Sequence, residues 1–87
     1  MNTKQRKTLK LIFKVPVPSD VRWADIETLF KGFGGEITEG RGSRIRVYLN
    51  EAKADFHRPH PRRVTDKGAL VSVRKFLINA GIKDDEI

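Results

Sequence analysis

Two histidines, three residues apart, are the side chains of this 87-residue sequence that suit proton transfer near neutral pH. Histidine is the residue type whose unperturbed pKa lies between about pH 5 and 8. His57 and His60 belong to the proline-containing stretch FHRPHP at residues 56–61. When RNA is cleaved by its own 2′-hydroxyl, one group must take the hydroxyl proton and another must protonate the leaving oxygen. A histidine pair is able to fill both roles.

Two other interpretations of the histidines are open at this point. Zinc sites draw on cysteine, histidine and carboxylate ligands, but the sequence has no cysteine and no glutamate near the pair. We therefore expect no metal and no other cofactor. The structural alternative is that His57 ends a strand and His60 fixes a loop by hydrogen bonding.

The basic residues are clustered along the chain. Lysine and arginine number 18 against 11 acidic residues, which gives a formal charge of +7. The first fourteen residues contain five basic side chains and no acid, and residues 41–63 contain seven against two acids. Such clustering predicts a polyanionic partner, most simply nucleic acid. The alternative is a solvated surface that keeps the chain soluble.

Three helices are predicted from apolar residues that recur every three or four positions. The first covers residues 3–13, the second contains the stripe Ile26, Leu29, Phe30 and Phe33, and the third follows the FHRPHP stretch. Proline or glycine ends each helix, at Pro16, Gly34 and Gly81. Candidate N-terminal caps precede the later two helices: Ser19 or Asp20, and Thr65 or Asp66. Trp23 is expected to pack in the core and not to stack on a base.

Three strands are predicted at residues 36–38, 43–49 and 52–57, because the last two alternate between apolar and polar side chains. A two-residue turn at Asn50–Glu51 sets their register. Ile45 then lies opposite Phe56 on the buried face. On the open face, Arg46 faces Asp55 and Arg44 faces His57. A slip of one residue would turn the arginines towards the core.

The order of these elements predicts an α+β fold, in which a three-stranded antiparallel sheet is covered by helices on one face. We expect a single domain over residues 1–87. It comprises an N-terminal helix and connector (1–18), a core (19–82) and an acidic tail (83–87). No apolar run has the length of a membrane span, and no cleavable signal is visible, so we expect no membrane contact and a cytoplasmic location.

Several short motifs, in their order and spacing, resemble those of the HicA toxins. They are Gly32-Phe33-Gly34, Gly42-Ser43, His60-Pro61, Lys67-Gly68-Ala69-Leu70 and Ala80-Gly81-Ile82. The resemblance covers about residues 20–82 and leaves the helix at 3–13 as an addition. It implies a double-stranded-RNA-binding-like fold, metal-independent cleavage of mRNA that arrests translation and growth, and a HicB antitoxin partner.

One position departs from the family pattern. The family's catalytic histidine lies at or just after Gly-Ser, where this sequence has Ser43 followed by Arg44. Arginine stays protonated, because its pKa is above about 12, and is therefore no general base. Since the predicted register places His57 opposite Arg44, we expect His57 to be the base and His60 the acid or a loop anchor. The expected phosphate ligands are Ser43, Arg44, Arg46, Arg58, Arg62 and Arg63.

Two further functions are consistent with this departure. The first is a catalytically inactive RNA-binding module that blocks messages by occupancy, since RNA-binding folds of this kind recognise phosphates and 2′-hydroxyls. The second is a protein-interaction domain whose basic face meets an acidic partner. Cleavage products distinguish the nuclease from both alternatives.

Overall fold

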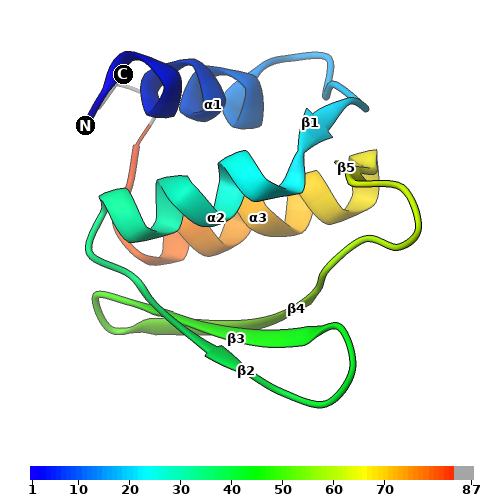
Figure 1. The fold of residues 1–87 in the computed structure, drawn as a ribbon. Helices are drawn as coiled ribbons and strands as arrows, with labels where there is room; N and C mark the ends of the chain where they lie inside the picture. Colours follow the sequence, from blue (N-terminus) through cyan, green and yellow to red (C-terminus); the bar gives the residue numbers. More distant parts are fainter. Residues whose placement is uncertain (84–87) are drawn as a thin grey trace.

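The computed structural model describes residues 1–83, in which helices and strands form three layers. The elements are α1 (Thr3–Phe13), β1 (Val21–Arg22), α2 (Trp23–Gly32), β2 (Glu36–Glu39), β3 (Arg44–Leu49), β4 (Ala52–His57), β5 (Val64–Thr65) and α3 (Lys67–Asn79). The sheet β2-β3-β4 forms one outer layer, α2 and α3 form the middle layer, and α1 lies on the far side of them (Figure 1). The α+β prediction and the N-terminal helix are both confirmed. Residues 84–87 of the expected acidic tail lie outside the described residues.

The β3–β4 hairpin has the predicted register. On the inner face the pairs are Leu49 with Ala52, Val47 with Ala54 and Ile45 with Phe56. Asn50 begins the turn with a φ of 54°, which is the left-handed conformation that a two-residue hairpin loop requires. Strand β2 pairs with the other side of β3 and runs one residue further than predicted, to Glu39. The sheet therefore turns its apolar residues towards the helices.

Aromatic side chains fill the space between the sheet and the middle layer. Phe30 of α2, Phe56 of the sheet and Phe76 of α3 all contact one another, with ring centroids 5.6–5.8 Å apart. The indole of Trp23 lies 5.7 Å from the Phe56 ring and is 5% exposed, so the prediction that it belongs to the core is confirmed. Offset and edge-on pairs at these distances are the favoured aromatic geometries.

The start of α2 differs from the prediction. Val21 and Arg22 form a short ladder with Thr65 and Val64, two segments in which no strand is predicted from the sequence. Arg22 is the N-terminal cap and makes no side-chain capping bond, so Ser19 and Asp20 do not cap this helix. The physical reason is that Val21 is buried in the core, which holds the backbone extended until Trp23. Asp66 caps α3 as predicted, because its side chain accepts a 2.7 Å bond from the Ala69 N–H.

Helix α1 is held at both ends. At its start, Asn2 and Gln5 form a reciprocal capping box, and the Gln5 amide also donates to the Thr28 carbonyl of α2. At its end, the Arg74 guanidinium of α3 donates to the carbonyls of Ile12 (2.7 Å) and Lys14 (2.9 Å). Between these anchors, Leu9 and Ile12 are completely buried. The added helix is therefore a packed layer of the fold. Among residues 1–83, no helix is long and apolar enough to cross a membrane.

Truncation of Ile12 tests this packing. Because the Ile12 side chain is fully buried under α1, Ile12→Ala should lower the free energy of unfolding by about 2–5 kcal/mol. Leu11→Ala, at a partly buried neighbour, should cost less than half as much. Urea titration followed by circular dichroism measures both variants. Equal stability of Ile12→Ala and the unmodified protein would show that α1 does not contribute to the core.

Candidate functional site

The open face of the sheet brings together a histidine and an arginine from neighbouring strands. Arg44 of β3 and His57 of β4 are direct cross-strand partners, and both are exposed. Side chains in such positions have their Cβ atoms about 5 Å apart. Gly42, with a φ of 60°, makes the turn that leads into β3. The arrangement places an imidazole beside a guanidinium that makes no ion pair with the described residues.

A second arginine of this face is already paired. The Arg46 Nε and Nη2 atoms donate to the two carboxylate oxygens of Asp55, at 2.6 Å and 3.1 Å. These hydrogen bonds lower the pKa of the Asp55 carboxyl and raise the pKa of the Arg46 guanidinium. Both side chains are about half exposed. Asp55 therefore offsets most of the charge that Arg46 offers to a phosphate, whereas no acidic side chain within residues 1–83 forms an ion pair with Arg44.

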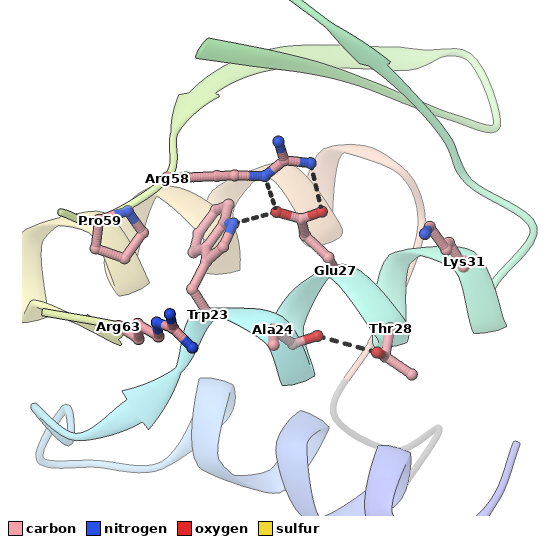
Figure 2. Close-up of a pocket in the computed structure, with 8 residues that line it drawn as sticks. All are labelled: Trp23, Ala24, Glu27, Thr28, Lys31, Arg58, Pro59 and Arg63. Atoms are coloured by element: carbon pink, nitrogen blue, oxygen red, sulfur yellow. Dashed lines mark hydrogen bonds and ion pairs between the residues drawn. The ribbon is translucent and has the colours of Figure 1, made fainter. Parts of the chain in front are cut away.

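Arg58 lies on the inner side of the sheet, beyond the end of β4, and contacts two carboxylates. Its Nε and Nη2 atoms donate to Glu27 of α2 at 2.7 Å and 3.0 Å. Its Nη1 and Nη2 atoms donate to Glu39 of β2 at 2.6 Å and 2.8 Å. The Trp23 indole N–H also donates to Glu27 (Figure 2). These contacts argue against Arg58 as a phosphate ligand and give it a structural role.

We call Arg58, its two carboxylate partners Glu27 and Glu39, and Trp23 the Arg58 cluster. The two carboxylates of this cluster remain ionised well below neutral pH. Burial raises the pKa of Glu27, but hydrogen bonds from Arg58 and Trp23 outweigh burial, so the pKa lies below its usual value. Hydrogen bonds from Arg58 also lower the pKa of Glu39. The same bonds raise the pKa of the Arg58 guanidinium. Glu27 already accepts three hydrogen bonds from Arg58 and Trp23, and is therefore a poor general base.

The cluster forms one wall of a cavity of about 410 Å³ that is lined by α2 and by the connection after β4 (Figure 2). Lys31 and Arg63 stand at opposite ends of it in this view, and Pro59 lies next to Arg58. The sequence analysis did not identify Glu27, the acidic residue that lines this cavity. A signal for it exists, because Trp23, Glu27 and Lys31 recur every four residues and therefore share one helix face.

The connection after β4 carries the remaining predicted residues. His60, Arg62 and Arg63 are exposed, and no hydrogen bond among residues 1–83 joins His60 to His57. Ser43 is exposed before β3, and its carbonyl accepts a 2.8 Å bond from the Arg58 N–H. The structure thus brings Arg44, His57 and Ser43 to one end of the hairpin, and leaves His60 and the two arginines on the adjoining loop. Within the described part of the chain, no three His, Asp or Glu side chains gather as metal ligands do.

Glu27→Gln tests the cluster through its pH dependence. The pKa of Glu27 in the folded protein is below the unfolded value of 4.5, so its stabilisation is full above pH 4.5 and is lost as the pH falls further. At pH 7 the variant should be less stable by about 1–3 kcal/mol, because hydrogen bonds to a charged group are lost. The loss should shrink in acid. Glu36→Gln is the control, because Glu36 is exposed and forms no ion pair with any residue of the described part of the chain. An identical pH profile for both variants would contradict the assignment.

Comparison with known proteins identifies the fold's family. A family model described as "HicA toxin of bacterial toxin-antitoxin" matches residues 23–82, well over half of the chain. No curated protein and no solved structure matches the chain. The matched segment starts with α2, ends just after α3, and contains the open sheet face, the Arg58 cluster and the loop with His60. The chain therefore belongs to the HicA family of toxins from bacterial toxin–antitoxin systems.

Proposed function

We propose that this HicA-family toxin is a metal-independent endoribonuclease that cleaves mRNA on the open face of its sheet and so blocks translation. The observation that carries the proposal is the direct pairing of Arg44 with His57 across β3 and β4. An imidazole accepts a proton near neutral pH, and a guanidinium binds the oxygens of a phosphate in a bidentate manner.

The chemistry needs no cofactor. His57 takes the proton of a ribose 2′-hydroxyl, and the 2′-oxygen attacks the adjacent phosphorus. Arg44 stabilises the charge that develops on the phosphoryl oxygens. The bond from phosphorus to the 5′-oxygen then breaks, and His60 of the neighbouring loop protonates the leaving oxygen. The products are a 2′,3′-cyclic phosphate and a new 5′-hydroxyl end.

The other predicted ligands act around this pair. Ser43 precedes Arg44, and Arg62 and Arg63 extend the basic surface along the loop. Arg46 contributes less, because Asp55 offsets its charge. Arg58 holds the end of β4 against α2 and β2 through its two carboxylates, and so positions His57 next to it.

A HicB-like antitoxin is the proposed protein partner. It inhibits cleavage by covering the open face, where Tyr48, a large aromatic residue that is 40% exposed, lies between its cross-strand partners Lys53 and Glu36. Exposed aromatic residues are common anchors of protein interfaces. An acidic surface around a pocket for Tyr48 is the complement that this face requires.

The second candidate function is inhibition by occupancy, in which the protein binds mRNA without cutting it. Arg44 favours this candidate, because it stands where the family resemblance places the catalytic histidine and cannot accept a proton. The open face would then bind phosphates alone. The protein would bind RNA at the same face and with the same affinity as the nuclease, but no new RNA ends would form.

Histidine variants separate the two functions. Purified protein, incubated with a defined single-stranded RNA in EDTA, should generate cyclic-phosphate ends. His57→Ala should lower the rate by about 10²–10⁴-fold, which is the usual contribution of a general base. His60→Ala should lower it less, and neither change should weaken binding by more than a few fold. Binding without cleavage by the unmodified protein would favour occupancy, and full activity of the double variant would exclude histidine catalysis.

Arginine variants test the electrostatics of the face. Arg44→Gln should reduce the slope of log Kd against log salt by about 0.7, the value for one phosphate contact to a single strand. Arg46→Gln should have a smaller effect, and Asp55→Asn should strengthen binding, because it releases Arg46. Fluorescence anisotropy over a range of salt concentrations measures all three. Equal slopes for the two arginine variants would show that the ion pair does not persist in solution.

A further inference from the structure

Helix α1 presents a continuous row of positive charge to solvent. Successive residues of an α-helix are rotated by about 100°, so residues 6, 7, 10 and 14 fall within an arc of about 100°. All four residues are exposed: Arg6, Lys7, Lys10 and Lys14. The side chains that anchor the helix, Thr8, Leu9 and Ile12, are buried on the opposite face. We call the four exposed residues the α1 basic stripe.

No acidic side chain among residues 1–83 neutralises this stripe. Residues 1–19 contain no aspartate or glutamate. The ion pair that α1 makes with α2 joins Lys4, outside the stripe, to Asp25 at 3.4 Å. No member of the stripe forms an ion pair with the described residues. The charge is therefore available to a ligand.

The lysines of the stripe also enclose a surface hollow. Lys7, Lys10 and Lys14 surround Leu11, and the four residues line a volume of about 430 Å³. Leu11 and the aliphatic stems of the lysines give the hollow an apolar lining, and lysine stems of this kind carry their ammonium groups towards solvent. A ribose with its flanking phosphates has this combination of an apolar body and anionic edges. The same helix is fixed by the Gln5 bond to α2 and by the Arg74 bonds to α3, so little entropy is lost when it binds.

We propose that the α1 basic stripe is a second RNA-binding site, which holds the phosphate backbone of the substrate on the side of the molecule away from the sheet. In Figure 1, the layer of α2 and α3 separates α1 from the three-stranded sheet β2-β3-β4. The stripe thus contacts a different segment of the RNA from the one at His57. The inference rests on the proposed function, because that function supplies RNA as the ligand. The site contributes to affinity and not to the chemical step.

An acidic protein is the competing ligand, and the composition of the surface favours RNA. The centres of protein interfaces are enriched in aromatic residues and depleted in lysine. The stripe contains three lysines and no aromatic residue, and the apolar residue that lines the hollow with these lysines is the partly buried Leu11. Backbone phosphates need no apolar contact and are bound by lysine and arginine alone.

The test compares two sets of lysine substitutions that remove equal charge. The stripe variant changes Lys7, Lys10 and Lys14 to Gln, a residue of similar helix propensity. The matched control makes the same change at three exposed lysines outside both surfaces, Lys67, Lys75 and Lys83. A third variant changes the stripe lysines to Arg and keeps the charge. Thermal unfolding confirms that each variant is folded.

The experiment measures binding over a range of salt concentrations. The ligand is a single-stranded RNA long enough to reach from the open face of the sheet to the α1 basic stripe. The stripe variant should bind at least tenfold more weakly at low salt, with a salt slope reduced by about 2, as expected for three lost contacts. The control should change little, and the Arg variant should retain binding. In cleavage assays, KM should rise for the stripe variant while kcat stays unchanged.

Several outcomes would overturn the inference, and they differ from those that would overturn the nuclease proposal. Equal weakening by both Gln sets would show a general effect of net charge, and no weakening would show that RNA does not touch α1. Loss of antitoxin binding without loss of RNA binding would identify a protein as the ligand. Weaker binding by the stripe variant, in a protein that never cleaves RNA, would support the stripe and exclude the nuclease.

Discussion

The register of the β3–β4 hairpin determines most of what this molecule can do. Ile45 and Val47 are completely buried against the helices, so Arg44 and Arg46, which alternate with them, must face solvent. A shift by one residue would bury Arg44 and Arg46 in an apolar layer, at a cost of several kcal/mol for each charge without a partner. The same apolar contacts that stabilise the fold therefore place Arg44 beside His57.

The Arg58 cluster joins this hairpin to the rest of the protein. It connects the end of β4 with α2 through Glu27 and with β2 through Glu39, so one guanidinium links three elements. The charge of Lys31 also acts on both carboxylates, so two basic side chains, Arg58 and Lys31, offset the two acidic ones. The cluster is therefore close to electrically neutral. Arg44 on the open face differs, because it forms no ion pair within residues 1–83.

The parts of the structure that the sequence predicts are those determined by local periodicity. Alternation in residues 43–57 defines the hairpin and the pairing of Arg44 with His57, and apolar stripes define the helices. The β1–β5 ladder is not predicted, because strands of two residues are too short to show an alternation of apolar and polar side chains. The start of α2 is not predicted either, because burial of Val21 overrides the capping preference of Ser19 and Asp20. Arg58 and Glu27 lie 31 residues apart, so nothing in the neighbourhood of Arg58 reveals its partner.

The division between the matched segment and α1 has a consequence for inhibition. The family match, residues 23–82, contains the proposed catalytic pair, whereas the α1 basic stripe lies outside it and on the other side of the α2–α3 layer. An antitoxin that covers the sheet face blocks His57 but leaves α1 exposed. If the stripe binds RNA, the inhibited complex keeps part of its affinity for messages and is already at its substrate when the antitoxin is removed. Affinity and catalysis, carried by different layers of one small fold, are then controlled separately.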